Sequence, residues 1–103
     1  MTESDLHRLI MLDLSADGHA VFRANVGQFF TKDGRPIRTG LPVGFSDLFG
    51  FRAGDARAFF LEVKTPTGRP TAQQLQFVEA MRQRGAIAGI VRSVDDARAL
   101  LSF

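Results

Sequence analysis

Hydrophobic residues change their spacing several times along the chain, and each change predicts a new element. Spacings of three and four residues are typical of a helix, whereas alternate positions are typical of a strand. The chain therefore predicts a helix over 3–14, strands over 19–26, 45–51 and 58–64, a helix over 71–84, a strand over 86–92 and a last helix that begins after Ser93. The order is helix, three strands, helix, strand, helix.

Turn and capping residues support these boundaries. The segment RAGDAR at 52–57 separates two apolar runs and predicts a β-hairpin. Thr71 and Gln74 match a capping box, and Gly85 is expected to end the helix that they open. Because an antiparallel hairpin is followed by a helical crossover into another strand, we expect an α+β domain with a central mixed β-sheet flanked by helices, in the order αβββαβα. The stretch 27–42 is expected to be long and irregular.

Length and composition narrow the class of protein. A chain of 103 residues without a repeat or a break in composition predicts a single domain over 1–103. The absence of cysteine excludes disulfides and thiolate zinc sites, and two histidines are too few for a histidine-rich metal site. No apolar run approaches the ~18 residues of a membrane span. Acidic residues stand near the start, where a signal peptide carries positive charge, so a cytoplasmic location is expected.

The basic residues point weakly to nucleic acid. The net charge is only +2, but Lys32 and Lys64 are the sole lysines, so 11 of the 13 basic residues are arginine. Arginine is the better bidentate ligand for phosphate. Lys32, Arg35 and Arg38 form a basic segment. It is either ordinary solvated surface or, beside a phosphodiester site, a clamp on the nucleic-acid backbone.

Three charged residues lie on the two strands of the predicted hairpin. Asp47 belongs to the first strand, and Glu62 and Lys64 to the second. Side chains alternate along a strand, so Glu62 and Lys64 share one face, whereas Leu61 and Val63 point to the core. Two acids and an amine in this arrangement suit a divalent cation beside a fixed positive charge. The alternative is an exposed strand pair that faces solvent.

Two polar residues share the apolar faces of their helices. Glu3 either looks inward at the start of the first helix or only favours the helix dipole. Gln74 either caps its helix by reaching back to Thr71 or points inward, where it would position a substrate oxygen or a water. One amide is expected to serve both purposes only by swinging between them.

Fourteen residues separate Asp47 from Glu62, and Lys64 follows Glu62 by two positions. This spacing is that of the PD-(D/E)XK nucleases, and the flanking residues make the match more specific. The chain resembles the VRR-NUC (virus-type replication-repair nuclease) family at 44–48 (GFSDL), 60–64 (FLEVK), 68–71 (GRPT), Gln74, Phe77, Gly85 and 91–93 (VRS). Glu3 and 22–27 (FRANVG) resemble the opening helix and strand of that family. The resemblance covers nearly the whole chain. One departure is Ser46, where the wider superfamily often has proline.

The resemblance implies a restriction-endonuclease-like core and an endonuclease that hydrolyses DNA with Mg²⁺ or Mn²⁺, as a stand-alone domain of phage or bacterial type. It implies that Asp47, Glu62 and the main-chain carbonyl of Val63 bind the cation. Lys64 would lie beside the attacking water, and Gln74 and Glu3 would complete the site. These side chains are then expected to converge on one pocket.

The same resemblance implies a partner and an assembly. Stand-alone members resemble Holliday-junction resolvases in organisation, so we expect branched or junction DNA as substrate and a homodimer, to which Phe29 and Phe30 would offer apolar surface. The candidate contacts to the DNA backbone are Lys32, Arg35, Arg38, Arg69 and Asn25. Two alternatives stay open: a catalytically silent DNA-binding module with this fold, and an interaction domain unrelated to nucleic acid.

Overall fold

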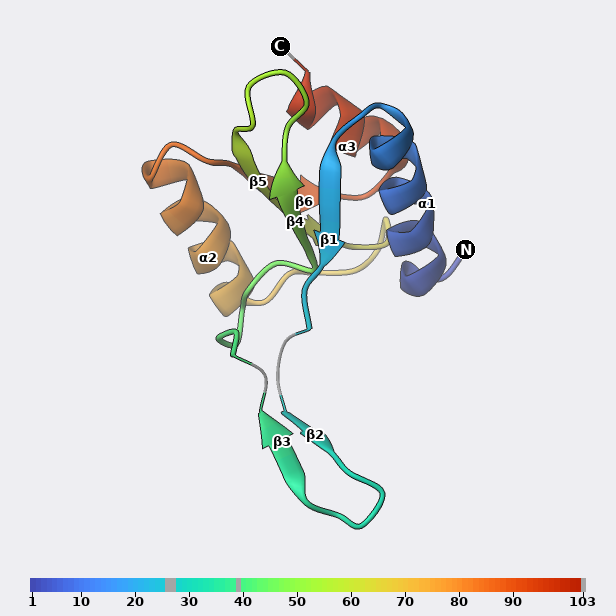
Figure 1. The fold of residues 1–103 in the computed structure, drawn as a ribbon, viewed down its shortest axis with the longest axis vertical. Helices are drawn as coiled ribbons and strands as arrows, with labels where there is room; N and C mark the ends of the chain where they lie inside the picture. Colours follow the sequence, from blue (N-terminus) through green and yellow to red (C-terminus); the bar gives the residue numbers. More distant parts are fainter. Residues whose placement is uncertain (26–27, 39, 103) are drawn as a thin grey trace.

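A computed structural model describes residues 1–25, 28–38 and 40–102, and its centre is a four-stranded mixed sheet (Figure 1). The strand order is β1-β4-β5-β6. The strands are β1 (Ala20–Arg23), β4 (Leu48–Phe51), β5 (Ala58–Val63) and β6 (Ile87–Val91), and the flanking helices are α1 (Glu3–Ala16), α2 (Ala72–Gln83) and α3 (Val94–Leu101). Only the β5–β6 pair is parallel. The predicted α+β fold with a mixed sheet is confirmed.

The helices divide between the two faces of the sheet, with α1 and α3 on one side and α2 on the other (Figure 1). Leu61 and Val63 point to the first side and are fully buried against the apolar faces of α1 and α3. Phe60 points to the second side and makes edge-to-face contacts with Phe45 and Phe77. The alternation predicted for β5 is therefore correct, and it directs Glu62 away from the main core.

A second, two-stranded sheet replaces the irregular stretch expected over 27–42. β2 (Gln28–Phe30) and β3 (Pro36–Arg38) pair antiparallel and extend away from the central sheet (Figure 1). The expectation was wrong because the turn between them is built from side-chain bonds rather than from an alternating pattern. The Thr31 hydroxyl donates to Asp33 and accepts from the Arg35 N–H, and Gly34 supplies the positive φ of +85° that the turn requires.

The segment before β4 is a turn rather than the start of a strand, so β4 begins at Leu48 instead of residue 45. Gly44 has a φ of +92°, and a Cβ atom there would lie 2.9 Å from the Gln73 carbonyl oxygen of α2. Ser46 is buried, and its hydroxyl donates to the Leu48 carbonyl at 2.9 Å. This bond ties the Ser46 side chain to the first residue of β4. The turn holds Asp47 at the entrance to β4.

Candidate active site

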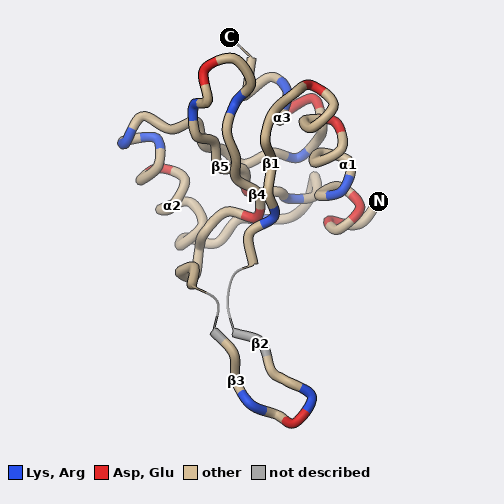
Figure 2. The backbone as a smooth tube through the Cα atoms, viewed as in Figure 1, with Lys and Arg blue, Asp and Glu red and all other residues tan. Residues whose placement is uncertain are grey.

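The acidic residues predicted for the site meet where β5 ends and β4 begins. These strands are antiparallel with Leu48 opposite Leu61, so Asp47, one residue before β4, comes beside Glu62 and Val63. Charged positions of both signs adjoin one another at this end of the sheet, near the base of β1 and β4 (Figure 2). The sheet therefore brings together two acids that are separated by fourteen residues in sequence.

Asp47 is held by one of its two carboxylate oxygens. The Val63 N–H donates to Asp47 Oδ2 at 3.0 Å, and His7 Nε2 lies 3.4 Å from the same oxygen. Burial alone raises the pKa of Asp47, but the interactions with His7, with the Glu62 carboxyl and with the Val63 N–H outweigh it, so the pKa lies below its ordinary value. Asp47 is thus kept as an anion, and the Val63 N–H and His7 both lie on the side of Oδ2 rather than Oδ1.

Glu62 is the most deeply buried acid of the site, with only 1% of its side chain exposed. Its Oε1 accepts from Gln74 Nε2 at 2.9 Å, whereas its Oε2 is buried without a hydrogen-bond partner. Burial and the adjacent negative charge of Asp47 raise the pKa of Glu62 to about 8, and the positive charge of Lys64 offsets part of this rise. Without a cation, Glu62 is the member of the acid pair that takes up a proton first.

Lys64 follows β5 directly and turns to the same side as Glu62. Its side chain is 14% exposed, and its Nζ lies 3.8 Å from Glu62 Oε1. The interpretation of Glu62 and Lys64 as an exposed pair facing solvent is therefore wrong. The strand places an ammonium group within the low-dielectric surroundings of both acids, where its charge acts more strongly than it would in water.

Gln74 performs two roles at once, which corrects the expectation that its amide must swing between them. Its Oε1 accepts from the Thr71 N–H at 2.8 Å and completes the capping box that begins α2. Its Nε2 donates to Glu62 at 2.9 Å. An amide carries an acceptor and a donor at its two ends, so one conformation satisfies both. The start of α2 is thereby fixed to the end of β5.

The first helix brings Glu3 and a residue that the sequence reasoning missed, His7. Glu3 Oε1 lies 3.7 Å from His7 Nε2, one helical turn away. One ligand atom each of Glu3, His7 and Asp47 lies within 4.8 Å of the others. The i, i+4 spacing from Glu3 was a signal for His7, because this spacing places two side chains on one helix face. The predicted residues Glu3, Asp47, Glu62, Lys64 and Gln74 thus come together at one end of the sheet.

The donor set fits a hard divalent cation. Glu62 Oε2 is a buried oxygen without a partner, which is costly unless a proton or a cation satisfies it. Asp47 offers a second oxygen beside it, and carboxylate oxygens are the ligands that Mg²⁺ and Mn²⁺ prefer. The backbone of Val63 lies next to Asp47, as its N–H bond shows. Its carbonyl oxygen stays a predicted ligand.

The pKa of Glu62 gives a testable dependence on pH. A carboxyl whose pKa rises on folding, from 4.5 to about 8 here, stabilises the fold fully below pH 4.5, and this contribution is lost as the pH rises towards 8. The contribution of Asp47 to stability changes with pH in the opposite direction and at lower pH, since its pKa is lowered from 3.8. In EDTA, the free energy of unfolding of the wild type, relative to that of Glu62→Gln, is expected to fall between pH 5 and 8.

Urea denaturation of both proteins across this range measures the difference. A difference that stays constant or grows with pH contradicts the assignment of the titrating proton to Glu62. Bound Mg²⁺ competes with that proton, so its affinity is expected to rise over the same interval.

The predicted DNA-contact residues lie at different distances from the acids. Lys32 and Arg35 occupy the turn of the β2–β3 hairpin, away from the acidic cluster (Figure 2), and Arg35 pairs with Asp33 at 3.1 Å. Arg69, between Lys64 and α2, is exposed. Asn25 is exposed after β1, whereas the side chain of Arg38 lies outside the part of the chain that the structure describes. Lys32 and Arg35 therefore lie apart from the acids.

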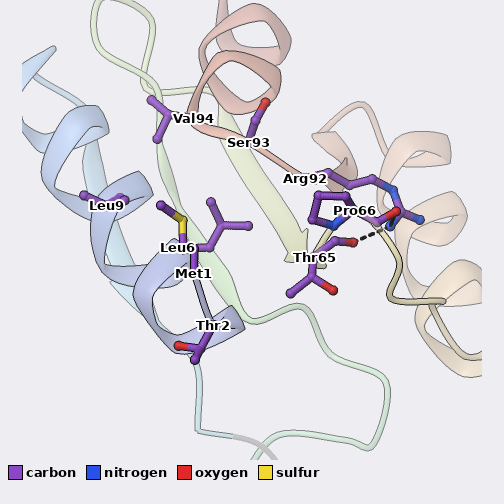
Figure 3. A pocket seen from close by; sticks show the side chains of 9 residues that line it. All are labelled: Met1, Thr2, Leu6, Leu9, Thr65, Pro66, Arg92, Ser93 and Val94. Carbon is purple, nitrogen blue, oxygen red and sulfur yellow. Dashed lines mark hydrogen bonds between the residues drawn. The ribbon is translucent and has the colours of Figure 1, made fainter.

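The loop that leaves Lys64 is held by Arg92. The Nη1 group of Arg92 donates to the carbonyls of Thr65 at 2.6 Å and Gly68 at 2.7 Å. Beside this loop is a mainly apolar pocket of about 250 Å³, lined by Met1, Thr2, Leu6, Leu9, Thr65, Pro66, Arg92, Ser93 and Val94 (Figure 3). None of the five converging residues lines it, so this pocket is separate from the candidate site.

The fold is a mixed α+β domain, and comparison with known proteins identifies its family. The family model for the VRR-NUC domain matches residues 22–95. The chain therefore belongs to the VRR-NUC domain family, which gives it a nuclease-type fold and implies DNA binding. The matched segment contains Asp47, Glu62, Lys64 and Gln74, whereas α1, with Glu3 and His7, precedes it.

Two solved structures have the same fold. One, described as a VRR_NUC domain, has a TM-score of 0.67 and 24% sequence identity, and the match covers 95% of this chain and 91% of that one. The other, described as a VRR_NUC domain protein, has a TM-score of 0.63 and 19% identity over 97% of this chain and 84% of that one. No match is found among curated proteins. In the ranges that the structure describes, no helix has the length and apolar character needed to cross a membrane.

Proposed function

We propose that this chain is an endonuclease that hydrolyses phosphodiester bonds of DNA with Mg²⁺ or Mn²⁺ held by Asp47 and Glu62. The observation that carries the proposal is the pair of adjacent acids in a VRR-NUC domain, each with one oxygen bound by the protein. Glu62 Oε2, buried without a partner, is the second oxygen of its carboxyl. The proposed ligand set also includes the main-chain carbonyl of Val63.

Each neighbouring side chain has a proposed task. A divalent cation in this position supplies Lewis acidity, which activates water and offsets the charge of the phosphate. Lys64 is proposed to stabilise the negative charge that grows on the phosphoryl oxygens and to lie beside the attacking water. Gln74 keeps Glu62 oriented through its 2.9 Å bond. Glu3 adds negative charge from α1, which raises the affinity of the site for a cation.

Branched DNA is the proposed substrate class, because the motifs of the chain resemble those of VRR-NUC members that are similar to junction resolvases. The test offers labelled four-way junction, flap and linear duplex to the wild-type protein with Mg²⁺, with Mn²⁺ and with EDTA. We expect cleavage only with a divalent cation and faster cleavage of the junction. Binding of the junction without cleavage under either cation would instead support the catalytically silent module.

Contacts to DNA phosphates are proposed for the basic side chains of Lys32, Arg35, Arg38 and Arg69. The polar side chain of Asn25 is a weaker candidate for such a contact. Arg69 is the most informative, because it is exposed and lies in the loop between Lys64 and α2. Removal of one phosphate contact is expected to weaken binding of every DNA and to reduce the slope of log affinity against log salt by ~0.9. Arg69→Gln, measured by fluorescence anisotropy at several salt concentrations, tests this expectation.

Arg84→Gln is the matched control for that measurement. Arg84 is also exposed, but it lies at the end of α2 remote from the loop after Lys64, and its guanidinium bonds the Ala80 carbonyl of its own helix. The control should keep the wild-type slope. If Arg69→Gln and Arg84→Gln have the same slope as the wild type, Arg69 makes no phosphate contact.

A homodimer is proposed because the β2–β3 hairpin carries apolar side chains that are exposed to solvent. Phe30 is 69% exposed and Ile37 is 49% exposed. Burial of such surface stabilises association by roughly 25 cal/mol per Å². The double variant Phe30→Ser, Ile37→Ser is expected to shift a micromolar solution from dimer to monomer, which light scattering after gel filtration measures directly.

Leu12→Ser controls for a general loss of apolar surface, since Leu12 is 64% exposed on α1 rather than on the hairpin. It should leave the dimer intact. A wild-type protein that is monomeric at micromolar concentration removes the dimer from the proposal, and it leaves the proposed chemistry unaffected.

A further inference from the structure

The proposed chemistry leaves one buried polar side chain of the site without a role, namely His7. It is 7% exposed, and it lies between Asp47 and Arg23, the last residue of β1. Its Nε2 atom has no close hydrogen-bond partner, although it is buried. A buried nitrogen that points at two carboxylates is costly to retain unless it acts on them.

The contact with Arg23 assigns the protons of the His7 ring. Arg23 Nη2 lies 3.3 Å from His7 Nδ1. A guanidinium group only donates hydrogen bonds, so Nδ1 must accept, and the neutral ring then carries its proton on Nε2. That N–H faces Asp47 Oδ2 at 3.4 Å and Glu3 Oε1 at 3.7 Å. Both distances are longer than a good hydrogen bond, and such bonds often tighten only when a site is loaded.

Two donors from different elements therefore converge on one oxygen of Asp47. The Val63 N–H approaches Oδ2 from β5, and the His7 ring approaches it from α1. The Val63 N–H bond holds the carboxylate, and a donor at the position of His7 Nε2 would further restrict its rotation about the Cβ–Cγ bond. Oδ1 is then the oxygen turned towards a cation, and the contact from His7 is expected to tighten as the cation binds.

We infer that His7 is a positioning residue, which donates from Nε2 to Asp47 Oδ2, while Arg23 fixes the ring, and so presents Asp47 Oδ1 to the cation. This inference rests on the proposed function, since it takes Asp47 as a metal ligand. His7 precedes the segment that the VRR-NUC family model matches. Loss of a partner that orients a metal ligand typically lowers metal affinity by about 10–100-fold.

Direct ligation by His7 is the competing use of the same nitrogen. Glu3, His7 and Asp47 each offer a ligand atom within 4.8 Å of the others, an arrangement that suits a transition-metal ion. Ligation requires the lone pair on Nε2, which moves the proton to Nδ1. Two donors, the Nδ1–H and the Arg23 guanidinium, would then face each other at 3.3 Å. The geometry favours the positioning role.

Variants of His7 that keep or remove the donor test this role through metal binding, without DNA. Calorimetric titration of Mg²⁺ and electron paramagnetic resonance of Mn²⁺ give the affinities. We expect His7→Leu to weaken both cations by about 10–100-fold. We expect His7→Gln, whose amide N–H replaces the Nε2–H, to lie within about threefold of wild type, because the orienting bond is restored. Equal affinities for wild type and His7→Leu overturn the role.

Two spectroscopic measurements on the wild type decide the matter even if His7→Leu does not fold. Long-range ¹H–¹⁵N spectra of the metal-free protein should show the proton of His7 on Nε2. Electron spin-echo modulation of the Mn²⁺-loaded protein should show no directly bound ¹⁴N. A proton on Nδ1, or a strong ¹⁴N coupling that His7→Gln removes, overturns the positioning role and leaves the proposed nuclease function standing. No binding of Mn²⁺ at all would instead refute the proposed function.

Discussion

Glu62→Gln is expected to slow metal-dependent cleavage severely without loss of the fold. The replacement removes a ligand from the proposed cation site, whose Lewis acidity is worth several kcal/mol, and about 1.4 kcal/mol corresponds to tenfold in rate. The rate with Mg²⁺ should therefore fall by roughly 10³-fold. The fold should persist because glutamine has the shape of the protonated carboxyl, and its amide oxygen still accepts from Gln74 Nε2.

Single-turnover cleavage of the preferred DNA, together with urea denaturation, measures both parts of this prediction. Glu79→Gln is the matched control, because it makes the same chemical change on the exposed surface of α2. There Glu79 pairs only weakly with Arg82, at 4.0 Å. The control should cleave at the wild-type rate. A Glu62→Gln protein that is folded and cleaves with Mg²⁺ at the wild-type rate would refute the assignment of Glu62 as a ligand.

Lys64→Ala is expected to lower the cleavage rate by ~10²–10³-fold at saturating Mg²⁺. The reason is the loss of a preorganised charge that stabilises the phosphoryl oxygens as the nucleophile adds. Unlike Glu62→Gln, it removes no metal ligand, so the protein should still bind Mg²⁺. Lys64 also lowers the pKa of Glu62, and its removal should therefore move the pH dependence of Mg²⁺ binding to higher pH.

Arg84→Ala serves as the control for Lys64→Ala, since it deletes a positive charge at the end of α2, away from the acids. A rate within twofold of wild type for Lys64→Ala with Mg²⁺ bound would remove Lys64 from the proposed chemistry. A loss of Mg²⁺ binding in that variant would mean that Lys64 acts on the structure of the acid pair rather than on the reaction.

The sequence predicted the parts of the site that depend on periodicity. Alternation along one strand placed Leu61 and Val63 in the core and Glu62 on the opposite face, and the structure agrees. The pairing of two strands then brought Asp47 to Glu62, because a hairpin fixes which residues lie opposite each other. The capping box likewise fixed where α2 begins.

The sequence could not predict contacts that depend on atomic detail. Gln74 bonds Thr71 and Glu62 at the same time, which requires the distance from α2 to β5 to match the length of one amide group. His7 is recognised only when Arg23 and Asp47 are seen on either side of it. The β2–β3 hairpin was missed because its turn is held by side-chain bonds of Thr31.

The most direct test of the central claim is the structure of a crystal soaked in Mn²⁺, with diffraction data measured at the manganese absorption edge. We predict an anomalous peak bound by Asp47 Oδ1 and Glu62 Oε2, with the Val63 carbonyl oxygen as a third ligand and Lys64 nearby. A peak elsewhere on the molecule, or none at a Mn²⁺ concentration that supports cleavage, would contradict the proposed site.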